Sequence, residues 1–312
     1  MADTKRIGSL DVFPLSLGGN VFGWTADQDA SYAVLDAYRA AGGNFVDTAD
    51  GYSAWVPGNH GGESETIIGE WMAARHAREE MVVATKVGAH PERKGLAPAN
   101  IHAACDDSLR RLRTDRIDLY YTHFDDESVP VEDIVGAMDE LKRAGKVREI
   151  AVSNISPERL EASLAASDRE GLAKYVAIQP HYNLVHRDEY EGRKLELAQR
   201  HGLACVPYYA LASGFLTGKY RPGQNVESPR AQGAGKYLGT ERGDRVLAAL
   251  DEIAADRNVP VATVALAWLA GRPTVAAPLA SARSVEQLPA LLGAAELALT
   301  AEEADRLTEA SA

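Results

Sequence analysis

Three side chains suited to acid–base chemistry follow short apolar runs. Asp47 ends FVD, Lys86 ends VVATK, and His123 follows LYYT. Tyr52 lies five residues after Asp47, in FVDTADGY. A free tyrosine has a pKa of about 10, and a neighbouring ammonium lowers that value because it favours the phenolate. We therefore expect Lys86, kept charged by Asp47 from the adjacent strand, to tune Tyr52 for proton transfer.

A tuned tyrosine suits the reduction of a carbonyl group. It can protonate the carbonyl oxygen while a hydride arrives at carbon, and His123 could donate a hydrogen bond to the same oxygen. The hydride must come from a cofactor, because no side chain supplies one. Other polar residues follow later apolar runs in the same way, namely Ser153 with Asn154, Gln179 and Tyr208.

Each of these residues also has an ordinary structural explanation. Asp47 could cap a helix, Lys86 could be a solvated surface residue, and His123 could be a structural histidine. The pair Ser153–Asn154 could cap the helix that follows it. Their joint occurrence at successive strand ends favours the catalytic interpretation. A metal-dependent hydrolase or lyase fits less well, because no His-x-His pair follows the first strand and no ligand cluster converges, so we expect no metal.

The chain alternates short strand-like runs with helical patterns. Several runs are apolar almost throughout, which is typical of parallel strands buried on both faces. The segments between them carry apolar residues at helical spacing, as in Ile134, Met138 and Leu141. The expected strands are Leu15–Leu17, Phe45–Asp47, Met81–Thr85, Asp118–Thr122, Glu149–Val152, Tyr175–Ile178, Leu203–Val206 and Thr274–Ala277.

The spacing of the strand ends predicts the architecture. Successive ends between Asp47 and Pro207 lie 26 to 39 residues apart, close to the minimum for a β/α repeat. Eight such repeats predict an α/β protein built as a (β/α)8 TIM barrel, in a single domain over residues 1–312. A doubly wound open sheet is the alternative, but LGGNVFGW after the first strand is not the expected G-x-G-x-x-G loop.

One interval is much longer than the others. From Pro207 to Pro278 the chain runs 71 residues. Within it, Pro222–Gly243 is rich in Gly, Pro, Gln, Asn, Ser and Arg, and it is predicted to be a long, functional loop. Helices are expected next, at Arg245–Arg257 and Pro260–Ala270.

Composition restricts the classes of partner. Of the 312 residues, 46% are apolar, which is enough for a large core. The formal net charge of −12 disfavours nucleic-acid and membrane binding. The two cysteines, Cys105 and Cys205, form no disulfide framework, and no apolar run of signal-peptide length follows the first residues. We therefore expect a cytoplasmic protein whose partner is a small carbonyl compound.

Several motifs together resemble the aldo-keto reductases. They are FVDTADGYS, VVATKV, DLYYTHFDD, AVSNIS, IQPHYNL and PYYALASGFLTGKY, and PLASARSVEQL resembles that family's adenosine-binding segment. The likeness runs from about residue 6 to residue 310. It implies a barrel with an N-terminal β-hairpin cap around Ile7 to Val12 and extra C-terminal helices. It also implies NADPH bound in an extended form and an aldehyde or ketone reduced to an alcohol.

The resemblance further implies a role for individual residues. The catalytic tetrad falls on Asp47, Tyr52, Lys86 and His123, with Tyr52 as the acid and His123 orienting the carbonyl. The residues expected to bind the nicotinamide are Asp47, Ser153, Asn154, Gln179 and Tyr208, whose ring stacks on it. The pyrophosphate is expected to bind to Leu211, Ser213, Gly214 and Lys219. The adenosine phosphate and the adenine are expected to bind to Ser281, Arg283 and Gln287, and Gly19 and Asn20 are expected to make further contacts with the cofactor.

Two choices remain open within this resemblance. An arginine at position 283 makes charge-assisted bonds to a phosphate, which favours NADPH while NADH stays possible. Aromatic residues in loops at a barrel mouth often line a pocket. The expected substrate contacts are therefore Trp24, Tyr52, Trp55, His123 and Phe124.

The sequence departs from the family pattern at four positions. The usual Tyr-Ser-Pro-Leu reads Tyr-Tyr-Ala-Leu at 208–211, Ser281 replaces a glycine, and Leu291 replaces an asparagine. These changes concern the cofactor and leave the tetrad intact. The second hypothesis is a cofactor-binding regulatory subunit with little turnover. Relatives of that kind commonly lack the catalytic histidine, whereas His123 is present here.

Overall fold

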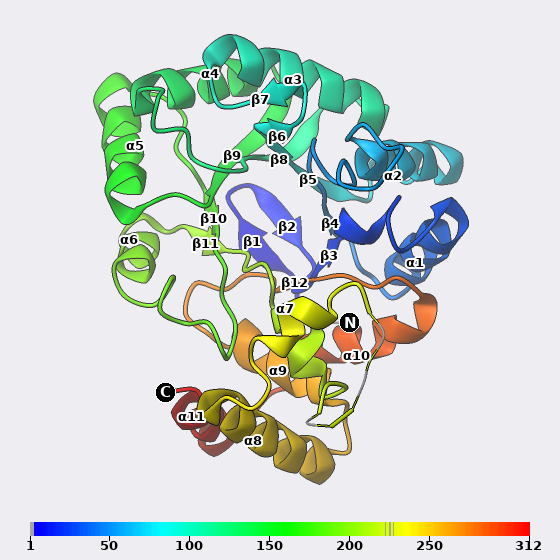
Figure 1. The fold of residues 1–312 in the computed structure, drawn as a ribbon. Helices are drawn as coiled ribbons and strands as arrows, with labels where there is room; N and C mark the ends of the chain where they lie inside the picture. The colour runs from blue at the N-terminus through cyan, green and yellow to red at the C-terminus, as the bar shows by residue number, and fades with distance from the viewer. Residues whose placement is uncertain (1–2, 222, 225, 227) are drawn as a thin grey trace.

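Eight parallel strands form one curved sheet in the computed structural model, which describes residues 3–221, 223–224, 226 and 228–312. The strand order is β11-β10-β9-β8-β5-β4-β3-β12. Hydrogen bonds also join the two edges, because Cys205 N donates to Thr274 O (2.8 Å) and Ala276 N donates to Cys205 O (2.9 Å). The sheet therefore closes into the predicted (β/α)8 barrel, and the open-sheet alternative is wrong (Figure 1).

The strands lie close to their predicted positions, with one exception. The barrel strands are β3 (Ser16–Gly18), β4 (Phe45–Asp47), β5 (Val82–Val87), β8 (Ile117–Thr122), β9 (Val147–Ser153), β10 (Ala177–Gln179), β11 (Ala204–Cys205) and β12 (Leu279–Ala280). The expected last strand, Thr274–Ala277, is wrong, since the segment that pairs with β3 is β12. Pro278 separates the two parts, and because proline has no N–H it interrupts the ladder. Residues before it bond to β11, and residues after it bond to β3.

Helices surround the barrel (Figure 1). They are α1 (Gln28–Ala40), α2 (Glu63–Arg75), α3 (Pro98–Leu112), α4 (Val131–Arg143), α5 (Pro157–Glu170), α6 (Arg193–His201), α7 (Ala231–Gly235), α8 (Glu241–Arg257), α9 (Val261–Ala270), α10 (Leu288–Leu292) and α11 (Ala301–Ala310). The predicted loop Pro222–Gly243 is wrong in part, because it contains α7 and the start of α8, while Pro222 lies outside the described residues. The helix α8 begins early because the Thr240 side chain caps it, accepting from Gly243 N at 3.1 Å. Within the described part of the chain, no helix is both long and apolar enough to cross a bilayer.

Alternating strand residues fill two separate cores. One set packs outward against the helices, and the other fills the barrel, with Phe45, Leu119 and Tyr121 among its members. The antiparallel hairpin β1 (Lys5–Ile7) and β2 (Leu10–Val12) adds its apolar residues to the inner core. The predicted hairpin cap is thus confirmed, and Figure 1 shows it within the ring of strands. A further short hairpin pairs β6 (Ala89–His90) with β7 (Arg93–Lys94).

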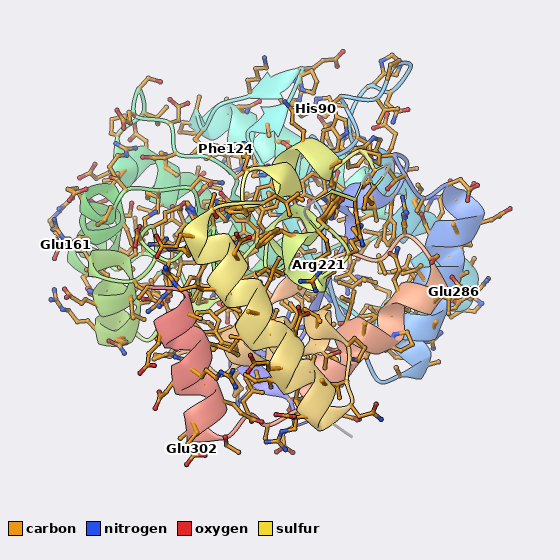
Figure 2. All side chains as sticks on the ribbon, turned by 60° about the horizontal axis from the view of Figure 1, so that its bottom comes forward. His90, Phe124, Glu161, Arg221, Glu286 and Glu302 are labelled. Atoms are coloured by element: carbon orange, nitrogen blue, oxygen red, sulfur yellow. The ribbon has the colours of Figure 1, made fainter. Side chains whose placement is uncertain are left out.

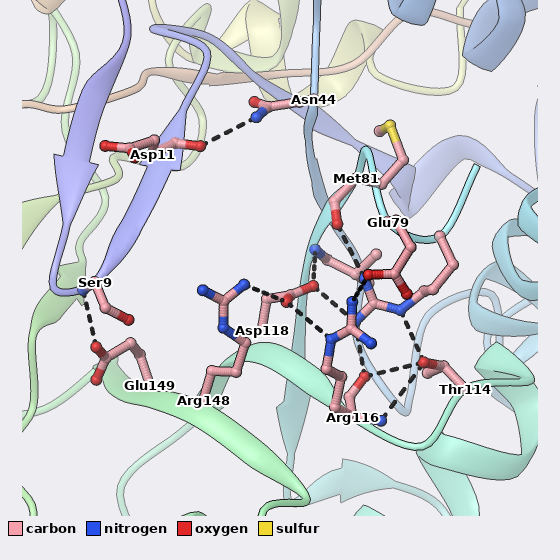
Figure 3. Close-up of polar contacts among 12 residues, drawn as sticks. Ser9, Asp11, Asn44, Glu79, Met81, Thr114, Arg116, Asp118, Arg148 and Glu149 are labelled. Carbon is pink, nitrogen blue, oxygen red and sulfur yellow. Dashed lines mark hydrogen bonds and ion pairs between the residues drawn. The ribbon is translucent and has the colours of Figure 1, made fainter.

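A buried carboxylate ties three strands together near the N-terminal ends of β8 and β9 (Figure 3). The Asp118 side chain is 1% exposed and lies 2.9 Å from Arg78 Nη2 and 3.1 Å from Arg148 Nη1. It also accepts a hydrogen bond from Val83 N at 2.9 Å. Because this cluster lies at the end of a barrel associated with stability, we expect it to hold the fold and to take no part in chemistry.

We predict that Asp118→Ala lowers the free energy of unfolding by about 1–3 kcal/mol, because the buried Val83 N–H loses its acceptor. Urea denaturation measures the change. The control is Asp115→Ala, whose side chain is 89% exposed and lies 3.7 Å from Arg116; we expect a change within about 0.5 kcal/mol. Equal stabilities of the two variants would contradict the structural role of Asp118.

Candidate active site

Strand alternation delivers the polar residues to one end of the barrel interior. Residues i and i+2 of a strand point to the same face, so a polar residue two positions beyond an inward apolar residue also points inward. Asp47 follows Phe45 in this way, and Lys86 follows Ala84. The same offset relates the remaining pairs, which are His123 with Tyr121, Ser153 with Ala151, Gln179 with Ala177, and Tyr208 with Val206.

The Lys86 ammonium lies at the centre of this group. It forms an ion pair with Asp47 Oδ1, donates to Thr48 O at 2.8 Å, and donates to the Tyr52 hydroxyl at 3.0 Å. The second carboxylate oxygen, Asp47 Oδ2, accepts from Gln179 Nε2 at 2.8 Å. Burial disfavours the ammonium, but Asp47 and Tyr52 together outweigh it and raise the pKa of Lys86, so the side chain stays charged.

The expected direction of the Tyr52 pKa shift is wrong. Burial raises the pKa of Tyr52 above its ordinary value, and the Lys86 ammonium offsets only part of that effect. Tyr52 is therefore a neutral phenol at pH 7. Since Lys86 donates to the phenol oxygen, the phenol proton is available to another acceptor.

His123 is held beside Tyr52 as a neutral imidazole. Its ring centroid lies 5.9 Å from that of Tyr52, and its ring stacks on Phe124 at 4.6 Å. Burial, and then the Lys86 charge, keep the pKa of His123 well below its ordinary value. A neutral imidazole keeps one N–H, so it can donate a hydrogen bond but cannot serve as a strong acid at pH 7.

Hydrogen bonds connect the strand ends on the other side of the site. Asn154 Nδ2 donates to His123 O at 2.8 Å, and Asn154 Oδ1 accepts from the Tyr208 hydroxyl at 2.8 Å. Ser153 Oγ donates to Gln179 O at 2.8 Å. The expected tetrad and these four residues therefore lie in one connected group.

The helix-cap explanation of Ser153 and Asn154 is wrong. The N-cap of α5 is Ser156, which accepts a hydrogen bond from Arg159 N at 3.2 Å. Asn154 instead adopts a φ of +48°, a left-handed conformation that non-glycine residues rarely take. Strained backbone of this kind concentrates at functional sites.

The expected phosphate-binding residues lie on the segment after β11. Leu211 precedes the 3-10 helix η2 (Ala212–Thr217), where Ser213 (φ +58°) and Gly214 (φ +93°) are both left-handed. Lys219 is exposed, and its ammonium lies 5.0 Å from the Tyr220 ring centroid. The turn therefore exposes a cation beside a strained backbone.

The expected adenosine residues meet the end of the first barrel strand. Ser281 Oγ donates to Asn20 Oδ1 at 2.6 Å, although 261 residues separate them. The exposed Arg283 donates through its backbone N–H to Gln287 Oε1 at 3.0 Å. Gly19 has a packing reason, because a Cβ there would lie 2.8 Å from Ser64 Oγ.

Aromatic side chains pack beside the Tyr52 ring. Trp55 packs edge-on against both Trp24 (5.6 Å between centroids) and Tyr52 (6.2 Å). Trp55 is 52% exposed and Phe124 is 53% exposed, although both are large and apolar. Figure 2 shows Phe124 at the upper end of the molecule in that view, far from Glu302. These residues form an apolar surface open to solvent.

Two residues near the site were not among the expected site residues. Arg230 lies in the segment expected to be a loop, and its Nη2 is buried with no partner among the described residues. Burial lowers the pKa of Arg230, and the charge of Arg283 lowers it further. Tyr209 adopts a φ of +52° and is 52% exposed. Only the replacement of serine in the family's motif pointed to Tyr209.

A histidine pair supports Tyr208 from behind. The His181 ring stacks on Tyr208 at 5.4 Å and on His186 at 3.7 Å, with 16° between the two imidazole planes. With Glu189, these side chains bring three possible ligand atoms within 4.8 Å. Nearly parallel imidazoles do not aim their in-plane lone pairs at one ion, so we interpret the cluster as packing behind Tyr208.

Known proteins with similar sequences complete the description. The model of the Aldo/keto reductase family matches residues 14–312. The aldo-keto reductase ausK of Aspergillus calidoustus is 33% identical over 94% of this chain and 77% of its own length. Protein tas of Escherichia coli strain K12 is 32% identical over 90% of this chain and 88% of its own length. An aryl-alcohol dehydrogenase (NADP(+)) of Phanerodontia chrysosporium is 31% identical over 96% of this chain and 83% of its own length. The chain therefore belongs to the aldo-keto reductase family of oxidoreductases.

Proposed function

We propose that this protein reduces an aldehyde or ketone to an alcohol, with Tyr52 as the proton donor and NADPH as the cofactor. The 3.0 Å contact between Lys86 Nζ and the Tyr52 hydroxyl carries the proposal. The ammonium would stabilise the negative charge that develops on the phenol oxygen as its proton leaves. Tyr52 can thus act as an acid although burial raises its pKa.

The other tetrad residues act through position and charge. Asp47 keeps Lys86 protonated, and the neutral His123 would donate a hydrogen bond that orients the carbonyl oxygen. NADPH, when bound, supplies the hydride that the carbonyl carbon accepts. The proton from Tyr52 goes to the carbonyl oxygen, which gives the neutral alcohol.

The charges near the strained turn fit a dinucleotide phosphate. Lys219 and Arg283 are exposed, and Arg230 has a buried Nη2 without a partner in the described chain, within a protein of net charge −12. We assign the pyrophosphate to Leu211, Ser213, Gly214 and Lys219, with Arg230 added. Asp47, Ser153, Asn154, Gln179 and Tyr208 are assigned to the nicotinamide. Gly19, Asn20, Ser281, Arg283 and Gln287 are assigned to the remainder of the cofactor.

The solvent-exposed apolar surface beside Tyr52 favours an aromatic carbonyl compound as the substrate. Trp55, Phe124 and Tyr209 each expose about half of their side chains, and Trp24 packs edge-on against Trp55. A planar ring covering them would bury aromatic surface and make stacking contacts. The name of the Phanerodontia chrysosporium relative, an aryl-alcohol dehydrogenase, supports the same class of substrate.

A single domain over residues 1–312 and a cytoplasmic location remain predictions.

We predict that the purified protein oxidises NADPH with 4-nitrobenzaldehyde, and that Tyr52→Phe lowers kcat by about 10²-fold or more, because the acid is lost while the ring remains. Absorbance at the NADPH band measures turnover, and fluorescence titration should show unchanged NADPH affinity. The control is Tyr32→Phe on α1, which removes only a 3.2 Å contact with Gln28. An active Tyr52→Phe variant would refute the assignment of the acid.

The same assay tests the two alternative functions. Negligible wild-type turnover with tight NADP binding would favour a regulatory subunit. Loss of activity on chelation would favour a metal-dependent hydrolase or lyase.

We also predict that Arg283→Gln weakens NADPH binding by about 10- to 100-fold and leaves NADH binding nearly unchanged, because only NADPH carries the 2′-phosphate. Quenching of tryptophan fluorescence measures both affinities. Arg200→Gln on α6 is the control, since that side chain is 62% exposed and lies 3.4 Å from Glu161. Equal weakening of both cofactors, or of neither, would contradict the role of Arg283.

A further inference from the structure

The loop that carries Tyr52 is fastened to the strand that carries Lys86 by a buried carboxyl group. Asp50, two residues before Tyr52, is 1% exposed. Its backbone N–H donates to Lys86 O at 3.1 Å, and its Oδ2 accepts from Gly88 N at 3.0 Å. These two bonds place Asp50 against the end of β5 on both sides of Val87.

The next residue brings the two backbones into direct contact. A Cβ on Gly51 would lie 2.8 Å from Ala89 O, so only glycine permits this approach. A displacement of Asp50 would therefore move Tyr52 relative to the Lys86 ammonium.

The charges around Asp50 do not balance if its carboxyl is ionised. Glu65 on α2 forms an ion pair with Arg111 on α3 (Nε to Oε2, 2.6 Å), and Thr85 Oγ1 donates to Glu65 Oε1 at 2.5 Å. Lys86 is taken by Asp47. Both cations near Asp50 are therefore paired with other carboxylates, and no ion pair to Asp50 forms among the described residues.

The remaining neighbours offer Asp50 no compensating charge. Asp50 Oδ1 and the Tyr120 hydroxyl on β8 are both buried and have no partner among the described residues. His90 of β6 uses its Nδ1 to accept from Glu92 N at 3.1 Å. Burial, and then Glu65, raise the pKa of Asp50 to about 7, while the backbone N–H groups of Gly88 and His90 and the charge of Arg111 oppose that shift.

We propose that Asp50 is a positioning residue for Tyr52, and that it holds the loop best when its carboxyl group carries a proton. Ionisation places an unpaired negative charge beside Glu65 and loosens the loop against β5. Turnover then falls as the pH rises through neutrality, because the Tyr52 hydroxyl leaves its place over Lys86. This regulation rests on the proposed function, in which Tyr52 donates the proton.

A pair of substitutions separates the contact from the charge. Asp50→Ala removes the acceptor for Gly88 N–H, and we expect kcat to fall about tenfold or more with unchanged NADPH affinity. Asp50→Asn keeps an acceptor without a charge, so it should recover most of that loss. Its kcat should also lack the wild-type decline between about pH 6 and pH 8 that follows the Asp50 pKa. A decline at higher pH, from ionisation of Tyr52, should persist in both proteins.

Thermal denaturation tests the charge state without turnover. The pKa of Asp50 is higher in the folded than in the unfolded chain, so wild-type stability falls as the pH rises from about 4 to about 7. Asp50→Asn lacks this loss. The melting temperature of the variant minus that of the wild type should therefore increase as the pH rises over the same interval. The control is Asp29→Asn, an exposed carboxyl in the first turn of α1, which should show no such gain.

Acrylamide quenching tests the loop itself. Trp55 lies on the Tyr52 loop and is half exposed, whereas Trp71 and Trp268 are buried. Quenching of Trp55, identified by its loss in Trp55→Phe, should increase above neutral pH in the wild type and not in Asp50→Asn. Identical pH profiles of quenching and melting in the two proteins would overturn the inference, even in an active enzyme. Absence of NADPH oxidation at every pH would instead overturn the proposed function. The quenching and melting profiles would then still test the role of Asp50.

Discussion

The buried pair of Lys86 and Asp47 is the interaction on which the site depends. An ammonium has three N–H groups, and here they point to Asp47 Oδ1, Thr48 O and the Tyr52 hydroxyl. Because each donor has a partner, the charge can be buried without a missing hydrogen bond. The same bonds fix Tyr52 relative to β4 and β5. Loss of either charged partner would leave the other buried and unpaired, which is strongly destabilising.

The barrel provides the environment that makes this pair effective. The hairpin cap and the inner core fill the barrel, and the residues of the candidate site form the next polar layer above Phe45 and Tyr121. Low water content strengthens the effect of Lys86 on the phenol oxygen, but it also raises the cost of forming a phenolate. The two effects oppose each other, and burial prevails in the resting protein. A neutral phenol beside a permanent ammonium is the state from which protonation of a carbonyl can begin.

The two ends of the barrel differ in how they use polar groups. At one end, Asp118 is shared by arginines and a backbone N–H, so its contacts serve the packing of β5, β8 and β9. At the other end, Asn154, Tyr209 and Ser213 all take left-handed backbone conformations. Such conformations cost free energy and persist where the surrounding structure imposes them.

Residue order alone determined the barrel and the presence of polar residues at its strand ends. The β/α repeat gives the strand count, and Asp47, Lys86 and Gln179 each come at the end of an apolar run. Only the structure showed that these side chains share the inner face, because strands buried on both faces are apolar on both. The tertiary structure alone decided the sign of the Tyr52 pKa shift, the neighbours of Asp50 and the position of Arg230. Burial and charge balance depend on groups far apart in the chain, as Asn20 and Ser281 illustrate, and no local pattern records which of them will meet.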